Sequence, residues 1–148
     1  MMLTASLPTA AVRLSREDLT AFGESVGRAL VPPHLLAVSG DLGAGKTTLI
    51  QAICTGYGVT SDVTSPTFSL VHVYEGERSQ AFHLDLFRLR DASELTNIGW
   101  DDILDEPAII LVEWPERAGP RLPMLRTHVH LEHVDHDPDV RALRADVA

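Results

Sequence analysis

The first part of the chain places apolar residues at helical spacing. They are Leu19, Phe22, Val26 and Leu30. Steps of three and four positions put them on one face of an amphipathic helix, which we predict over residues 16–30. Ser15, with Asp18 three positions later, is typical of a helix N-cap, and Pro32 and Pro33 end the pattern.

A strand and a second helix are predicted after these prolines. The short apolar run HLLAVSG, residues 34–40, predicts a buried strand. A glycine-rich turn leads from it into a second helix, predicted over residues 45–55, which we expect Gly56 and Gly58 to end.

Alternating and continuous apolar runs predict further strands. FSLVHVYEG alternates, Gly76 turns the chain, and AFHLDLFRL predicts the antiparallel partner. The continuous run AIILVEW predicts a strand that is buried on both faces. THVHLEHV and VRALRADV flank DHDPD and predict a second hairpin. Short helices are predicted within residues 91–97 and 100–104, and an irregular segment over PERAGPRLP.

These elements predict an α/β fold of the P-loop NTPase type, which is a mixed sheet with parallel core strands, added antiparallel hairpins and flanking helices. The length of 148 residues and the absence of repeats favour a single domain over residues 1–148. No apolar run approaches the roughly 20 residues of a membrane span, and the N-terminal segment lacks the pattern of a secretion signal. The single cysteine, Cys54, is typical of a protein in the reducing cytoplasm, where we expect this one.

The acidic charge narrows the classes of partner. The formal net charge is −9. Proteins that grip nucleic acid directly usually carry a basic surface, because phosphate contacts supply much of the affinity. We therefore expect no direct binding to DNA or RNA, whereas an acidic surface suits docking onto a basic protein partner.

The glycine-rich turn matches a phosphate-binding pattern. Residues 40–47 read GDLGAGKT, which fits G-x-x-x-x-G-K-[ST]. Glycines let successive N–H groups converge on an anion, and the helix that follows adds the positive end of its dipole. Lys46 can reach the β- and γ-phosphates, and the Thr47 hydroxyl can bind Mg²⁺. The alternative is a plain glycine turn with an exposed lysine.

Such a site also needs a carboxylate at the end of a neighbouring strand. Glu113 ends the most apolar strand, and Asp85 lies between alternating apolar residues; either could instead be an ordinary exposed side chain. The segment TSPTFS, residues 64–69, suits a switch loop around the γ-phosphate or a plain strand entry.

Other polar residues support weaker interpretations. His128, His130 and Glu132 alternate on one strand face and could bind a metal, although exposed histidines on a strand are commoner. We expect His83 to be packed or hydrogen-bonded and Cys54 to be a small buried residue. A solvated acidic patch is predicted at Asp101, Asp102, Asp105 and Glu106.

The motifs GDLGAGKTT, SPTF, HLDLFRL and LVEWPER, in this order and spacing, resemble the TsaE family. The resemblance covers about residues 14–115. Members of this family are small bacterial P-loop ATPases required for threonylcarbamoyladenosine modification of tRNA. The resemblance implies ATP and Mg²⁺ as cofactors and weak ATPase activity alone. It also implies action on a TsaB–TsaD complex, with tRNA contacted only through these partners and no role at a membrane or on DNA.

The resemblance further implies roles for single residues. The phosphates would be wrapped by Gly43, Ala44, Gly45, Lys46, Thr47 and Thr48. Mg²⁺ would be held by Thr47 and Glu113. Lys46, Asp85 and Glu113 would be the catalytic residues, with Asp85 orienting water or metal near the γ-phosphate.

Around this centre, the resemblance makes Thr64 to Phe68 the switch segment and places Trp114 beside the site. Residues 14–17 would lie near the adenine. Phe87 departs from the family, which often has tyrosine there. It lacks the hydroxyl on which a polar role of that tyrosine would depend, whereas the packing of the ring is kept.

Two other functions stay open from the residues alone. One is a small-molecule kinase with the same loop, although no long arginine-bearing lid is visible. The other is a nucleotide-dependent adaptor that does not turn over. Arg88 and Arg117 lie near the predicted site strands and are either arginine fingers or surface charges. The C-terminal hairpin, beyond the resemblance, carries no predicted function.

Overall fold

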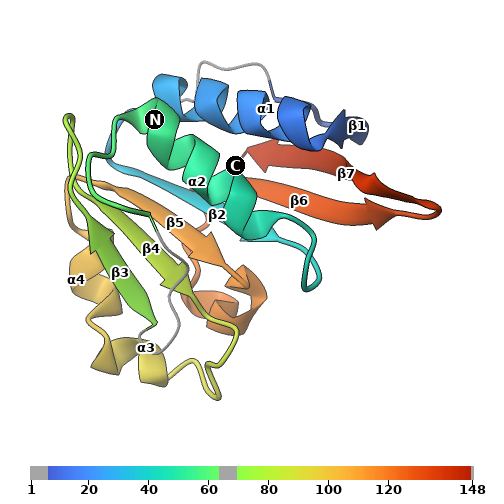
Figure 1. Ribbon diagram of the computed structural model, residues 1–148. Helices are drawn as coiled ribbons and strands as arrows, with labels where there is room; N and C mark the ends of the chain where they lie inside the picture. Colours follow the sequence, from blue (N-terminus) through green and yellow to red (C-terminus); the bar gives the residue numbers. More distant parts are fainter. Residues whose placement is uncertain (1–6, 64–69, 148) are drawn as a thin grey trace.

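The computed structural model describes residues 7–63 and 70–147. Within these ranges a seven-stranded sheet has the order β1-β7-β6-β2-β5-β4-β3 (Figure 1). The strands are β1 (Val12–Ser15), β2 (His34–Ser39), β3 (Val71–Tyr74), β4 (Ala81–Asp85), β5 (Ile109–Glu113), β6 (Thr127–Val134) and β7 (Asp137–Val147). Strands β6, β2, β5 and β4 run parallel to one another, whereas β3 pairs antiparallel with β4, and β7 pairs antiparallel with β6 and with β1. The predicted mixed sheet with a parallel core is confirmed.

Two helices cover one face of the sheet. α1 (Arg16–Ala29) and α2 (Lys46–Tyr57) pack side by side (Figure 1). The Ser15 hydroxyl accepts a hydrogen bond from the Asp18 N–H at 3.1 Å, so the predicted N-cap of α1 is confirmed. Leu19 and Val26 of α1 join the apolar residues of α2 and of the sheet in one core cluster. Burial of this apolar surface is the main term that holds the helices on the sheet.

The opposite face is covered by short elements, which are α3 (Glu94–Asn97), α4 (Trp100–Leu104) and the 3₁₀ helix η1 (Pro115–Arg121). Trp100 lies in a second core cluster beneath them. The sequence analysis predicted both α3 and α4. Its prediction that the segment PERAGPRLP is irregular is wrong, because η1 occupies most of that segment.

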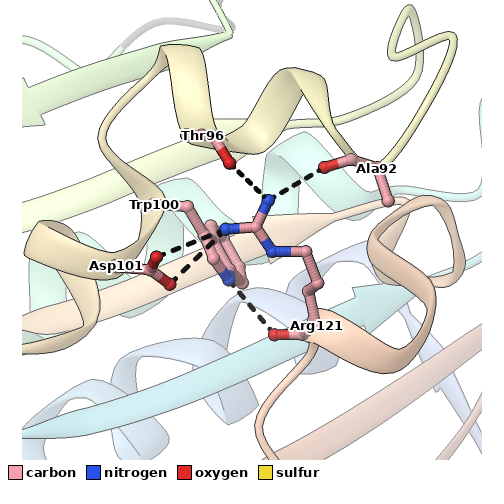
Figure 2. Close-up of polar contacts among 5 residues, drawn as sticks. All are labelled: Ala92, Thr96, Trp100, Asp101 and Arg121. Carbon is pink, nitrogen blue, oxygen red and sulfur yellow. Dashed lines mark hydrogen bonds and ion pairs between the residues drawn. The ribbon is translucent and has the colours of Figure 1, made fainter.

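Arg121 fastens these short elements together (Figure 2). Its guanidinium donates to the Ala92 carbonyl at 3.2 Å and to the Thr96 hydroxyl at 2.9 Å, and it lies 3.4 Å from the Asp101 carboxylate. The Trp100 indole N–H donates to the Arg121 carbonyl at 3.1 Å. The end of η1 is therefore tied both to α4 and to the turn that includes α3.

The contact between α1 and α2 explains an error in the predicted end of α2. A Cβ added at Gly56 would collide with the Glu24 carbonyl, and one at Gly27 would collide with the Ile53 carbonyl. Gly56 therefore serves close helix packing, and α2 continues to Tyr57. The helix ends at Gly58, which has φ 93°.

Two further differences concern the C-terminal hairpin and the N-terminal segment. The sequence did not predict β1, whose residues are mostly exposed and which forms by pairing with β7. The predicted turn DHDPD is too long. Val134 pairs with Asp137, so Asp135 and His136 alone make the turn, and His136 has φ 65°. None of the described helices combines the length and the apolar character that crossing a bilayer requires.

Arg78 caps the C-terminal ends of α1 and α2. Its guanidinium donates to the carbonyls of Gly27 at 2.7 Å and Leu30 at 2.9 Å, and to that of Tyr57 at 3.1 Å. It also lies 4.2 Å from the centre of the Tyr57 ring. The last carbonyls of a helix have no partner within the helix, and a cation there is favourable.

We expect Arg78→Met to lower the free energy of unfolding by about 1–2 kcal/mol, because the carbonyls lose a charged donor that is partly exposed to water. Urea denaturation of the variant and the wild type measures the difference. Arg90→Met is the matched control, since Arg90 is exposed and such a change should stay within about 0.5 kcal/mol. Equal effects of the two variants would contradict the role of Arg78.

Candidate functional site

The glycine-rich loop has the backbone that its sequence predicts. It joins the end of β2 to the start of α2. Gly43 and Gly45 have φ of 77° and 100°, in the left-handed region that other residues rarely adopt. The Leu49 N–H donates to the Gly45 carbonyl at 2.9 Å, which begins the helix. The predicted succession of strand, loop and helix is confirmed.

A cavity of about 380 Å³ opens at this loop. Most of the predicted site residues line it, namely Gly43, Gly45, Lys46, Thr47, Thr48, Asp85 and Glu113. Ala44 does not line it, because its side chain is buried in the core and its N–H donates to the Asp41 carbonyl at 3.0 Å. Trp114 and Phe87 complete one wall. The volume is within the range of small-molecule sites.

Lys46 is buried and held by the loop itself. Its ammonium donates to the Gly40 carbonyl at 2.6 Å and to the Asp41 carbonyl at 2.8 Å, and lies 4.4 Å from the centre of the Trp114 ring. Burial lowers the pKa of Lys46, whereas the charges of Glu113 and Asp85 act in the opposite direction. Among the described residues, the hydrogen-bond acceptors of the Lys46 ammonium are therefore two neutral carbonyls.

The two predicted carboxylates are neighbours. Asp85 and Glu113 are directly paired at the carboxyl ends of the parallel strands β4 and β5. The pKa of Asp85 is raised, chiefly by burial and further by the negative charge of Glu113. The hydrogen bond that its carboxylate accepts from the Phe87 N–H, at 3.0 Å, opposes this rise. Asp85 is half-buried, whereas Glu113 is 3% exposed.

Glu113 is fixed by a buried histidine. Nε2 of His83 lies 2.7 Å from Oε2 of Glu113, and Nδ1 of His83 lies 3.1 Å from the Tyr74 hydroxyl. Because a carboxylate only accepts, Nε2 carries the hydrogen, and in the neutral ring Nδ1 then accepts from the Tyr74 O–H. The prediction that His83 is packed or hydrogen-bonded is confirmed, but the sequence did not reveal its partners.

Two aromatic rings form the wall beside Lys46. The rings of Phe87 and Trp114 are 4.9 Å apart, and Trp114 has φ 56° where β5 gives way to η1. The expected packing of the Phe87 ring is therefore seen. Trp114 lines the cavity, next to the site as expected.

The remaining expectations have mixed outcomes. Of residues 14–17, Arg16 lines the cavity. The guanidinium of Arg117 donates to the Leu89 carbonyl at 3.4 Å, and Arg88 is exposed. Thr64 to Phe68, the expected switch segment, lies outside the described residues. Cys54 is buried, and burial raises the pKa of its thiol to about 12. The four residues of the acidic patch are exposed, as predicted.

The histidines of β6 have other partners. Nε2 of His128 lies 2.6 Å from the Ser39 hydroxyl, and the rings of His128 and His130 stack at 4.1 Å. His130 lies 3.2 Å from the Asp146 carboxylate. Within the part of the chain that the structure describes, no three His, Cys, Asp or Glu side chains form a group that could hold a metal.

The C-terminal hairpin also reaches the cavity, which the sequence did not predict. Pro138, Asp139 and Arg141 line it. No local motif marks these residues, because the pairing of β7 with β6 and β1 alone brings them beside the loop.

A divalent cation would find suitable ligands in this cavity. The Thr47 hydroxyl and the carboxylates of Glu113 and Asp85 line it together, and Mg²⁺ prefers such oxygen ligands. The donor set fits Mg²⁺ better than a metal that favours nitrogen or sulfur.

The glycine loop between β2 and α2, with carboxylates on the neighbouring strands, defines a P-loop protein of the α/β class. The sequence model of the family described as "Threonylcarbamoyl adenosine biosynthesis protein TsaE" matches residues 14–143. The chain belongs to the TsaE family.

Individual relatives agree with this assignment. Proteins named "tRNA threonylcarbamoyladenosine biosynthesis protein TsaE" include one from Nostoc sp., 37% identical over 123 residues, which are 81% of this chain and 75% of the relative. The protein of that name from Mycobacterium tuberculosis is 34% identical over 142 residues, 90% of this chain and 80% of the relative. The crystal structure of Bacillus subtilis YdiB shares the fold, with a TM-score of 0.77 at 24% identity, covering 98% of this chain and 90% of YdiB.

The environment of His128 predicts a pH-dependent stability. Burial, and then the neighbouring His130 and Arg126, lower the pKa of His128 to about 4, against the opposing charge of Asp146. The unfolded chain therefore binds more protons at this residue between about pH 6.5 and pH 4, so its contribution to stability falls as the pH falls through that window.

We expect wild-type protein to lose more stability between pH 7.5 and pH 5 than His128→Gln, which does not titrate. Urea denaturation at both pH values measures the two losses, and groups common to both proteins cancel in the comparison. His136→Asn, at the exposed turn, is the matched control and should behave as the wild type does. Equal losses in wild type and His128→Gln would refute the shifted pKa.

Proposed function

We propose that the chain is a cytoplasmic, single-domain P-loop ATPase that binds ATP·Mg²⁺ and acts on a TsaB–TsaD complex in threonylcarbamoyladenosine modification of tRNA. The observation that carries the ATPase proposal is the convergence of Lys46, Thr47, Asp85 and Glu113 on one cavity. Family membership and the names of the relatives support the pathway. The acidic net charge of −9 suits a protein that works through protein partners and leaves tRNA to them.

Phosphate binding would begin at the loop. The N–H groups of the loop and the first turn of α2, with the positive end of the helix dipole, favour an anion. Lys46 would exchange the Gly40 and Asp41 carbonyls for phosphate oxygens, which are stronger acceptors because they are charged. Thr47 and Glu113 would hold Mg²⁺, which would supply positive charge against the phosphates.

The carboxylates would set the geometry of attack. One oxygen of Asp85 is fixed by the Phe87 N–H, and its other oxygen would orient water beside the γ-phosphate. Glu113, held by His83, would be a Mg²⁺ ligand together with Thr47. Phosphoryl transfer needs positioning and charge stabilisation more than covalent help, so these groups suffice for slow hydrolysis, and the partner complex would complete the site.

We expect Lys46→Ala and Glu113→Ala each to lower partner-stimulated phosphate release by at least about 100-fold, since each removes a charged group at the reacting phosphates. The assay measures phosphate released from ATP by purified protein with and without TsaB–TsaD, with no acceptor added. Glu132→Ala, an exposed carboxylate of β6, is the control. Normal hydrolysis by the two site variants, with unchanged circular dichroism, would refute the assignment.

The same assay separates the rival functions. Phosphate release into water without an acceptor favours the ATPase over a kinase. Single-turnover release with the partner complex present distinguishes it from an adaptor that does not hydrolyse ATP.

Lys46 is also the only lysine in the sequence. Reductive ¹³C-methylation thus labels one side chain besides the N-terminus, and a shift of its NMR signal on adding ADP·Mg²⁺ reports binding without turnover.

Mg²⁺ should increase the affinity of the wild type for ADP, and we expect this increase to be about tenfold smaller in His83→Leu. Residues that orient a metal ligand typically contribute 10- to 100-fold to metal affinity. Titration calorimetry with Mg²⁺ and with EDTA measures this gain. His83→Gln should retain much of it, since the glutamine amide can replace the Nε2–H donor. Equal Mg²⁺ dependence in wild type and His83→Leu would contradict a positioning role for His83.

A further inference from the structure

The side chains of the β6–β7 hairpin bind successive carbonyls of the phosphate loop. The Arg141 guanidinium donates from Nη2 to the Gly43 carbonyl and from Nε to the Ala44 carbonyl, both at 3.1 Å. Nε2 of His133 lies 3.2 Å from the Leu42 carbonyl, to which it donates. Three consecutive carbonyls of the loop therefore have partners from one hairpin.

Arg141 is itself held rigidly. Its Nη1 donates to the carbonyls of Pro138 at 2.6 Å and Val140 at 3.0 Å. His133 and Arg141 are paired residues on β6 and β7, so both side chains leave the same face of the hairpin. Among the described residues no carboxylate lies within ion-pair distance of Arg141. The positively charged guanidinium of Arg141 therefore lies against the loop carbonyls, and the residue lines the cavity.

The physics of the peptide group links these contacts to anion binding. The C=O and N–H of one trans peptide point in opposite directions within a rigid plane. The carbonyls of Leu42 and Ala44 belong to the peptides that carry the N–H groups of Gly43 and Gly45. A donor on the carbonyl fixes the plane and polarises the N–H on its other side, which strengthens that N–H as a donor. Gly43 and Gly45 both line the cavity, whereas the Ala44 N–H is used within the loop.

We propose that Arg141 and His133 are positioning residues that hold the loop in its anion-binding form before any ligand arrives. The ligand chemistry they serve is the phosphate chain of a nucleotide, so the inference rests on the proposed function. The contribution of Arg141 comes from its fork of donors, which spans two carbonyls, and a point charge does not replace it. The C-terminal hairpin thereby becomes part of the site.

The test is Arg141→Lys, which keeps the positive charge and removes the fork. In unliganded protein we expect hydrogen exchange of the amides at residues 43–46 to become about tenfold faster, because charged hydrogen bonds that restrain local opening are lost. Affinity for inorganic pyrophosphate and for ADP·Mg²⁺ should fall by about tenfold, since the loop must now be ordered on binding. NMR exchange and titration calorimetry measure the two effects.

Two comparisons sharpen this test. Arg144→Lys is the matched control, because Arg144 lies on the same strand and its guanidinium contacts Asp146 at 3.0 Å, so neither effect should appear. His133→Gln should keep the wild-type exchange rate of the Gly43 amide, since the glutamine amide can still donate to Leu42. His133→Leu should raise that rate.

Each result decides between support and refutation. Wild-type exchange and affinity in Arg141→Lys would overturn the inference. Unchanged exchange with weakened affinity would overturn it as well, because the guanidinium would then act on the phosphates directly. If the wild type bound neither pyrophosphate nor ADP·Mg²⁺, the proposed function would fail, whereas the exchange rates of the unliganded protein would still decide whether the hairpin positions the loop.

Discussion

The parallel pairing of β4, β5 and β2 is the constraint on which the site depends. Asp85 lies opposite Glu113, and Glu113 lies opposite Val38, two residues before the glycine loop begins. Because parallel strands end together at one edge of a sheet, side chains far apart in sequence meet there. A slip of one residue in either pairing would turn a carboxylate to the other face. The register of these strands therefore decides which face of the sheet carries the two carboxylates.

The site also brings charges of like and opposite sign close together, with Lys46 and Glu113 buried and Asp85 half-buried. Each charged group has its own fixed hydrogen-bonding partner, namely loop carbonyls for Lys46, the His83 ring for Glu113 and a backbone N–H for Asp85. A buried charge without such partners would be costly. These contacts keep the groups separate and available, because none of them is consumed in a direct pair with another. The arrangement is a preorganised set of charges, in which Lys46 is not paired directly with either carboxylate.

Local chemistry explains what the sequence predicted well. The N-cap at Ser15, the loop and the end of the β5 strand each depend on a few adjacent residues, and the structure places them as expected. Two of the errors arise where a residue serves a distant contact. Gly56 is required by the packing of α1, and β1 exists only through β7. The roles of His83 and Arg141 likewise depend on neighbours about 30 and 97 residues away, and no local pattern encodes these.

The attachment of Arg121 has a mechanical consequence. Trp114 lies against Lys46 at one end of a short segment whose other end is bonded to the helical turns around Ala92, Thr96 and Trp100. The backbone between these two ends is kinked at Gly119, which has φ 56° and ψ −134° inside η1. The aromatic wall beside Lys46 and the acidic surface of α4 therefore share one support, since the same short segment carries Trp114 and is bonded to α4.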